Sequence, residues 1–267
     1  MFDEMTFRAR NLVSRWWEGL PSWANVPSRL ISEKRANLKF AKQFSAFSKL
    51  HHATGRSEAV DWVDRYPCLG DATGATGFDR HYIYHPAWAV RILSRTRPLE
   101  HTDISSTLIF STLLSAFIPT RFFDYRPAPI VLDGLQAGST DLVNLHFADE
   151  SIDSLSCMHV MEHIGLGRYG DPLDPMGDRK AAGELQRVLK RGGNLLVVVP
   201  VGRPRVQFNA HRIYDHRDFR DWFDELELAE FSLVPDGDAP DGLIVNPPPS
   251  LVDEQEYGCG CYWLRKP

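Results

Sequence analysis

The stretch "DRKAAGELQRVLKRGGNLLVVVP" (178–200) joins two structural elements of different kinds. Its first half spaces apolar residues as an amphipathic helix does, and Gly192 and Gly193 provide a helix stop. The second half, at 194–200, is a continuous apolar run. A strand with no polar face is typical of the middle of a parallel sheet. The stretch therefore predicts a helix that leads directly into a buried strand, which is the repeating unit of α/β folds.

Comparable units lie on both sides of this stretch. Strand and helix patterns alternate from residue 100 onward with short links, which indicates right-handed crossovers in an open sheet. We therefore predict a doubly wound, mostly parallel sheet of seven strands within residues 78–267, preceded by a helical extension or cap at 1–77. The expected strands include 100–105, 121–126, 151–160, 194–200, 228–234 and 258–266, and the expected helices are 31–50, 107–118, 178–190, 216–226 and one that begins near Pro86.

Charge and composition narrow the function classes. The net charge of −5 provides no general basic field for nucleic acid, so no nucleic-acid partner is expected. Residues 1–50 hold nine basic and four acidic side chains, a local balance of +5. This segment could meet phosphate or a membrane surface, or it could be an ordinary solvated helical cap.

Two further features concern the compartment. The four cysteines, at 68, 157, 259 and 261, form no C-x-x-C pair and no disulfide framework. The sequence has no apolar run of about 18 residues, so no integral membrane segment is expected. The start "MFDEMTFRAR" also lacks the apolar core of a secretion signal. We expect a reducing, cytoplasmic location. The sequence gives no oligomeric state.

Polar residues gather where the predicted strands end, and open α/β sheets bind ligands at that edge. Asp124 ends the second strand, 21 positions after Asp103. A carboxylate at this place suits the two hydroxyls of a ribose. The helix after the first strand opens with Ser105-Ser106-Thr107, and its free N–H groups favour an anion. Together these features predict a pocket for a nucleoside with a charged tail.

These segments resemble the class I S-adenosylmethionine-dependent methyltransferases. The resemblance rests on "HTDISS" (101–106), "FFDYRP" (122–127), "LHFADESID" (145–153) and "LKRGG" (189–193), in that order. The strings "EHIGLGRYGDPLDPMGD" (162–178) and "FNAHRIY" (208–214) resemble an uncharacterised family within that superfamily, often found among polysaccharide genes. The resemblance implies a Rossmann-like methyltransferase domain, S-adenosylmethionine as cofactor, and a small-molecule or saccharide acceptor.

The resemblance also implies roles for individual residues around the cofactor. The predicted contacts are Asp103, Ser105, Ser106 and Thr107 with the methionine part, Asp124 with the ribose, Asp141 and Leu142 with the adenine, and His159 with the sulfonium. A base is needed to take the acceptor's proton, and a histidine with a pKa near neutral suits that task. The candidates for this base are His159, His163 and His211.

Two loops are candidates for the acceptor site. Residues 205–214 offer Arg205, Asn209, His211, Arg212 and Tyr214, which could close over an acceptor. Residues 165–174 could wall the same site, with Arg168 and Asp171 as a pair, or could pack on themselves. The aromatic residues Tyr82, Tyr84 and Trp88 could cover the cofactor or belong to the core.

Two alternative functions remain open. The resemblance implies glycines where the chain has Ser105 and Thr107. A left-handed backbone at such a site costs a non-glycine residue about 1–2 kcal/mol. This departure suggests a methyltransferase fold without catalysis that serves as a binding or scaffold protein. His159-Val160-Met161-Glu162-His163 also matches the H-x-x-E-H pattern of zinc peptidases, which would make the chain a zinc hydrolase. We expect no metal, and we expect Cys259 and Cys261 to be buried thiols on one face of a strand.

Overall fold

The computed structural model describes residues 26–237 and 241–267. Contacts divide the chain into two units, residues 1–77 and 78–267. Residues 1–25, half of the basic segment, lie outside the described residues, so the role of that segment stays a prediction. In the described ranges no helix is long and apolar enough to cross a membrane.

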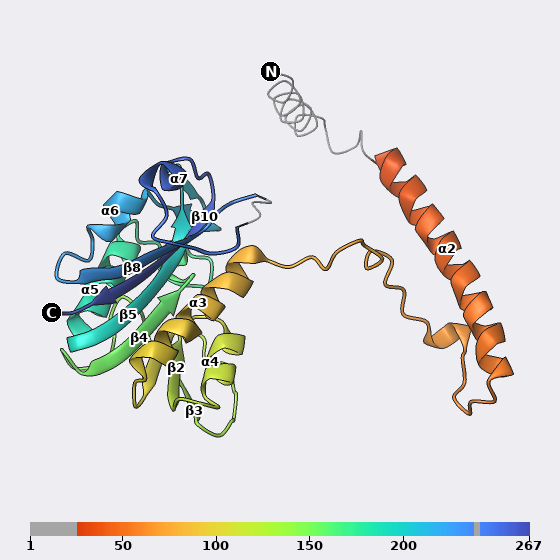
Figure 1. Cartoon of the computed structure of the whole chain (residues 1–267), viewed down its shortest axis with the longest axis horizontal. Coiled ribbons are helices and arrows are strands. Elements are labelled where there is room, and N and C mark those ends of the chain that lie inside the picture. The colour runs from red at the N-terminus through yellow and green to blue at the C-terminus, as the bar shows by residue number, and fades with distance from the viewer. Residues whose placement is uncertain (1–25, 238–240) are drawn as a thin grey trace, which may run out of the picture. The chain divides into compact units, whose positions relative to one another are not determined.

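The first unit contains the helix α2 (Val26–Ala53) and the short 3-10 helix η2 (Trp62–Asp64) (Figure 1). The segment after α2 folds back along the helix. The rings of Phe44 and Trp62 meet edge-on, with their centroids 4.9 Å apart. The Nε2 atom of His51 lies 2.8 Å from the carbonyl oxygen of Glu58. The helical extension predicted from the sequence is thus present in the described part of this unit.

The second unit contains an eight-stranded sheet with the order β3-β2-β1-β4-β5-β10-β8-β9. The five strands from β3 to β5 are parallel, and β10, β8 and β9 each pair antiparallel with the strand before them in this order. The doubly wound fold class is confirmed, with one strand more than expected, because β9 adds two residues at the edge. The strands are β1 (His101–Ile104), β2 (Thr120–Asp124), β3 (Leu135–Ser139), β4 (Ile152–Met158), β5 (Leu189–Val201), β8 (Glu227–Val234), β9 (Ile244–Val245) and β10 (Gly258–Arg265).

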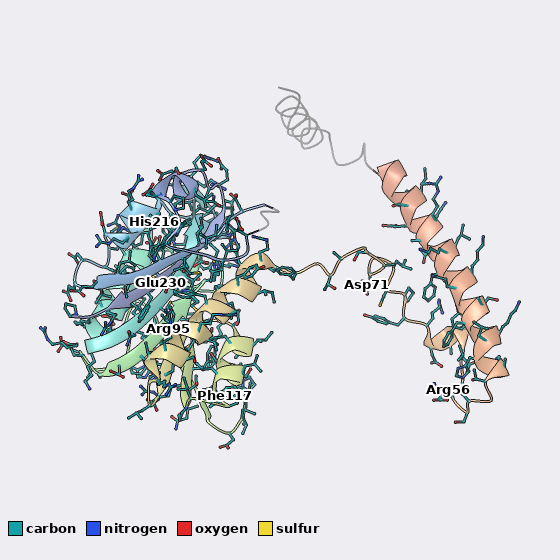
Figure 2. All side chains as sticks on the ribbon, in the orientation of Figure 1. Arg56, Asp71, Arg95, Phe117, His216 and Glu230 are labelled. Carbon is teal, nitrogen blue, oxygen red and sulfur yellow. The ribbon has the colours of Figure 1, made fainter. Side chains whose placement is uncertain are left out.

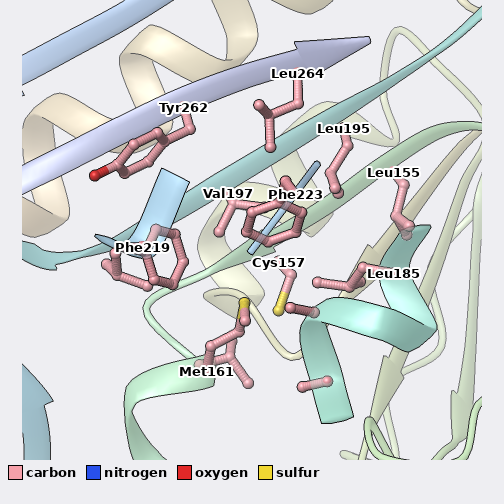
Figure 3. Close-up of a cluster of buried hydrophobic side chains, with 14 of the residues drawn as sticks. Leu155, Cys157, Met161, Leu185, Leu195, Val197, Phe219, Phe223, Tyr262 and Leu264 are labelled. Atoms are coloured by element: carbon pink, nitrogen blue, oxygen red, sulfur yellow. The ribbon is translucent and has the colours of Figure 1, made fainter. Parts of the chain in front are cut away.

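Helices cover both faces of the sheet. The apolar run in β5 explains why, because alternate residues of a strand face opposite sides. Leu195 and Val197 belong to one buried core, and Leu196 and Val198 belong to another. Figure 3 shows the first core, where Leu185 packs near these strand residues. The helices of this unit are α3 (Arg80–Thr96), α4 (Leu108–Leu114), η3 (Met161–His163), α5 (Gly177–Val188), α6 (His216–Arg220) and α7 (Pro249–Asp253).

The helix α3 begins earlier than the sequence pattern indicated. Asp79 caps its start, since its side chain accepts a hydrogen bond from the N–H of Tyr82 at 3.2 Å. Pro86 therefore lies inside the helix. The prediction that the helix begins near Pro86 is wrong. The middle and the end of α3 are bonded to the sheet. The carboxylate of Glu230 in β8 accepts a hydrogen bond from Trp88 at 2.9 Å and pairs with Arg95 at 3.1 Å (Figure 2).

Two further boundaries differ from expectation. The helix α5 ends at Val188, and β5 takes over at Leu189, before the two glycines that were predicted to stop the helix. Residues 205–214, predicted as a loop, contain a small hairpin formed by β6 (Arg205–Gln207) and β7 (His211–Ile213).

Candidate functional site

A cleft opens at the carboxyl ends of β1, β2 and β4, the edge at which ligand binding was predicted. It consists of three adjoining chambers, and Ser105 and Tyr169 line all of them. We call them the apolar chamber, the middle chamber and the polar chamber. Their volumes are about 210, 150 and 320 Å³ respectively. The middle chamber shares Val160 and Ile164 with the apolar chamber, and His159 and His163 with the polar chamber, so it lies between the two.

The apolar chamber lies beside the loop that follows β3. Asp141 and Leu142 line it, together with Val143, Val160 and Ile164. Leu142 is buried, and the Oδ1 atom of Asp141 accepts a hydrogen bond from the N–H of Val143 at 3.1 Å. Asp171 and Asp174 also line this chamber, and an apolar recess with carboxylates at its edge suits a flat, partly polar ring.

The loop at 164–177 forms the far wall of the apolar chamber. The Asp171 carboxylate organises it, because it accepts bonds from the N–H groups of Gly165 at 2.7 Å, Gly167 at 3.3 Å and Tyr169 at 3.1 Å. Burial alone would raise the pKa of Asp171, but these N–H donors lower it below its usual value. The predicted pair between Arg168 and Asp171 is wrong, since Arg168 donates to the carbonyl of Ala210 at 3.0 Å.

Asp124 lines the middle chamber at the end of β2. Its Oδ1 atom accepts a hydrogen bond from the N–H of Arg126 at 2.7 Å, which holds the carboxylate in place. The guanidinium of Arg126 lies over the Tyr169 ring at 4.5 Å. Asp124 therefore stands between the apolar and polar chambers, at the position predicted for a ribose.

Ser105, Ser106 and Thr107 form the floor of the polar chamber. The backbone of Ser105 has a φ of 56°, so the left-handed conformation at this non-glycine residue is indeed adopted. Its N–H donates to the carbonyl of Phe123 at 2.7 Å. Ser106 accepts a bond from the N–H of Met158 at 3.0 Å, and Thr107 caps α4 through the N–H of Phe110 at 3.2 Å. These side chains support the loop and leave the chambers open.

Asp103 lies beneath the cleft and lines none of its three chambers. Its carboxylate is fully buried and accepts bonds from the hydroxyls of Ser111, at 2.8 Å, and Ser156. Burial raises its pKa to about 6, against the lowering effect of Ser106, Ser156 and Ser111. The predicted contact of Asp103 with the methionine part is therefore corrected, because the side chain turns into the sheet.

His159 follows β4 directly and has a φ of 57°. Its Nδ1 atom lies 2.7 Å from Oε1 of Glu162, and both side chains are buried. Burial disfavours the imidazolium, but the neighbouring Cys259 and Glu162 raise the pKa of His159 above its ordinary value. Burial also raises the pKa of the Cys259 thiol, so at neutral pH the carboxylate of Glu162 is the charge that matters. A protonated His159 does not accept a proton, which removes it as the predicted base.

His163 and His211 keep the properties expected of a base. Both line the polar chamber, and burial lowers the pKa of each, so they are neutral at pH 7. The Nδ1 atom of His163 lies 2.7 Å from the carbonyl oxygen of Ala210, which assigns the ring proton to Nδ1 and leaves Nε2 as an acceptor. The Nε2 atom of His211 is buried, with no partner among the described residues.

The peptidase-like pattern is not formed. That pattern needs both histidines on one α-helix, whereas His159 adopts a left-handed backbone and Glu162 and His163 sit in the 3-10 helix η3. Glu162 supports His159, and His163 turns toward Ala210. The zinc hydrolase built from these three residues is therefore not supported.

Several lining residues were missed or undervalued by the sequence reasoning. Tyr169 and Tyr257 line the cleft, and Tyr82 lines it instead of belonging to the core. Trp88 is a core residue, and Tyr84 is packed partly against the same core. His81 stacks on both His159 and Tyr257, with ring centroids 5.3 and 5.0 Å apart. The spacing of His81 and His85 on one helix face was the signal that could have drawn attention to this region.

Comparison with protein families gives one match. The model of a family described as "Caenorhabditis protein of unknown function, DUF268" matches residues 139–228, from the end of β3 to the start of β8. A search of curated proteins found no match.

Comparison with solved structures gives many matches, of which three serve as examples. The N-methyltransferase NodS from Bradyrhizobium japonicum, in complex with S-adenosyl-L-homocysteine, has 15% identity and a TM-score of 0.48, covering 68% of this chain and 85% of its own. A S-adenosylmethionine-dependent methyltransferase from Clostridium acetobutylicum has 10% identity and a TM-score of 0.46, with coverages of 68% and 90%. The [4+2]-cyclase SpnF has 14% identity and a TM-score of 0.46, with coverages of 68% and 81%. The family model that matches is that of an uncharacterised family, and two of these three structures are described as methyltransferases.

Proposed function

We propose that this chain is an S-adenosylmethionine-dependent methyltransferase that acts on a small hydroxyl-bearing acceptor. One observation carries the proposal: the three chambers follow one another from apolar to polar, with the Asp124 carboxylate between them. An adenosine with a charged amino-acid tail has the same order of chemical groups. When bound, S-adenosylmethionine would supply an electrophilic methyl group.

The lining residues fit such a cofactor in their chemistry. Leu142 and Val160 would flank the adenine in the apolar chamber, with Asp141 at its polar edge. Asp124 would accept hydrogen bonds from the ribose hydroxyls. Ser105, Ser106 and Thr107 would face the charged tail from the floor of the polar chamber.

The acceptor would occupy the remainder of the polar chamber. The rings of Tyr82 and Tyr257 border it and offer faces on which a small ring can stack. His163 would take the proton from the acceptor hydroxyl through Nε2, because Ala210 occupies its Nδ1. A saccharide is our preferred acceptor class, since it combines stacking faces with many hydroxyls. His211 would complete the polar wall.

Calorimetry with S-adenosylhomocysteine tests the proposal. We expect the full chain to bind it and Asp124→Ala to weaken that binding at least tenfold. The exposed Asp133, which lies before β3 and outside the three chambers, provides the matched control, and Asp133→Ala should leave the affinity unchanged. If the wild-type chain gives neither heat nor a thermal shift at millimolar ligand, the cofactor proposal fails and the scaffold alternative takes its place.

A further inference from the structure

Three side chains with metal-binding atoms converge beside the polar chamber. They are His81 in the first turn of α3, His159 after β4 and Cys259 in β10. One ligand atom from each lies within 4.8 Å of the other two. The Nε2 atom of His159 is 3.5 Å from the sulfur of Cys259. All three belong to the second unit, and distant parts of its sequence bring them together.

The donor set favours one class of ion. Imidazole nitrogen combined with a cysteine sulfur is typical of zinc sites, whereas magnesium and calcium take oxygen ligands. Two ligands bound at about 2.0–2.3 Å to a tetrahedral zinc are themselves about 3.5 Å apart. The separation between His159 and Cys259 matches this value. The ligand atom of His81 lies within 4.8 Å of the other two, so the His81 ring would move closer when an ion binds.

The surroundings resemble those of histidines that hold a metal. Such histidines usually donate their other ring N–H to a carboxylate or a backbone carbonyl, which fixes the ring and its tautomer. His159 has this arrangement with Glu162, at 2.7 Å. The His81 ring stacks on that of Tyr257, with the ring centroids 5.0 Å apart. Glu162 thus holds Nδ1 of His159, and an ion that binds at Nε2 would displace the proton from that nitrogen.

Glu162 provides an independent sign. Its Oε2 atom is buried and has no partner among the described residues, although the side chain lines the polar chamber. A buried carboxylate oxygen without a donor costs free energy. A cation next to its hydrogen-bonded partner His159 would offset that cost, and a water bound to the cation could supply the missing donor.

We propose that His81, His159 and Cys259 hold a zinc ion, with Glu162 as the outer partner of His159 and a fourth position open to water or ligand. This site differs from the H-x-x-E-H arrangement considered above, because it uses only the first histidine of that motif. It also assigns Cys259 a role, in place of the buried thiol expected from the sequence. The proposal does not depend on the methyltransferase proposal.

Metal analysis of the full chain, purified without a metal-affinity step, tests the site. We expect about one equivalent of zinc in the wild type after incubation with zinc and dialysis, and less than a fifth of that in Cys259→Ser and His81→Gln. Cys261→Ser is the matched control, since Cys261 is buried two positions along the same strand. It should keep the metal. Glu162→Gln should weaken zinc binding about 10- to 100-fold.

A second measurement covers variants that fail to fold. The wild-type chain loaded with cobalt should show the thiolate-to-metal charge-transfer band of a sulfur ligand, and the band should be absent from Cys259→Ser. Wild type without zinc after reconstitution, or Cys259→Ser with a full equivalent and the same cobalt band, would overturn the site. S-adenosylhomocysteine titrations on the same samples keep this outcome separate from that of the cofactor proposal.

Discussion

The Asp171 carboxylate accepts a hydrogen bond from the backbone N–H of Gly165 at 2.7 Å, six residues earlier in the chain. The same carboxylate also holds the N–H groups of Gly167 and Tyr169. One side chain therefore determines the shape of the loop that closes the apolar chamber. Gly165 is required at its place, because it has a φ of 77° and an added Cβ would lie 2.0 Å from the carbonyl oxygen of Asp174.

We expect Asp171→Ala to lower the free energy of unfolding by about 2 kcal/mol, since several charge-assisted hydrogen bonds to a partly exposed group are lost. S-adenosylhomocysteine binding should weaken as the wall loosens. Urea denaturation and calorimetry measure the two effects. The matched variant Asp171→Asn keeps one acceptor oxygen. It should therefore lose less of the free energy of unfolding and less of the affinity for S-adenosylhomocysteine. Equal behaviour of the two variants would show that the N–H bonds do not hold the loop.

Ser105 allows a prediction in the opposite direction. Its left-handed backbone, with a φ of 56°, is one that glycine adopts without a steric penalty. Ser105→Gly should therefore raise the free energy of unfolding by up to about 1 kcal/mol, the relief of strain being partly cancelled by the greater freedom of the unfolded chain. Affinity for S-adenosylhomocysteine should stay the same or rise. A clear loss of both stability and affinity would show that the serine hydroxyl contributes more than its backbone costs.

His163 is the residue on which methyl transfer should depend. His163→Gln should reduce transfer about 100-fold or more, within the range for general base catalysis, because glutamine keeps a polar side chain but accepts no proton. S-adenosylhomocysteine binding should change less than threefold. Transfer of a labelled methyl group to a panel of saccharides measures the first quantity, and calorimetry measures the second. Undiminished transfer by this variant would move the proton-accepting role to His211.

Buried His101 should make stability depend on pH. Its nitrogens lie 2.8 and 2.9 Å from the hydroxyls of Ser154 and Ser156, and burial lowers its pKa to about 3. The unfolded chain binds a proton at this residue below its ordinary pKa, and the folded chain does not. The contribution of His101 to the free energy of unfolding is therefore constant above pH 6.5 and is lost as the pH falls toward 3. The loss reaches roughly 2 kcal/mol by pH 5.

Urea denaturation at pH 7 and pH 5 tests this dependence, with wild type and His101→Asn compared at both values. The stability advantage of the wild type should be smaller by about 2 kcal/mol at pH 5, because asparagine does not titrate. Ionisable groups that share no partner with His101 are present in both proteins and cancel in the comparison. An advantage that is the same at both pH values would contradict the lowered pKa.

Much of the fold could be predicted because it depends on local pattern. The apolar run of β5 and the amphipathic pattern of α5 follow from residue spacing, and the order of elements limits the topology. The boundary of α3 was missed, since the Asp79 cap competes with the stronger-looking signal of Pro86. The hairpin at 205–213 has no clear strand alternation, and its pairing is a tertiary effect.

The site was predicted less completely for a different reason. Asp124, Asp141 and Ser105 follow strands, and topology alone brings strand ends together. The direction of a side chain is set by packing, so the inward turn of Asp103 could not be foreseen. The group formed by His81 and Cys259 joins residues far apart in sequence, and no spacing rule connects them.

The place of β10 in the sheet has a consequence for biosynthesis. β10, at residues 258–265, pairs with β5 on one side and β8 on the other. Until the ribosome has released these residues, both neighbours present unpaired backbone to the solvent, and such edges invite association with other chains. Nascent protein stalled before residue 258 should therefore recruit chaperones, and it should be released from them once β10 has been inserted between β5 and β8.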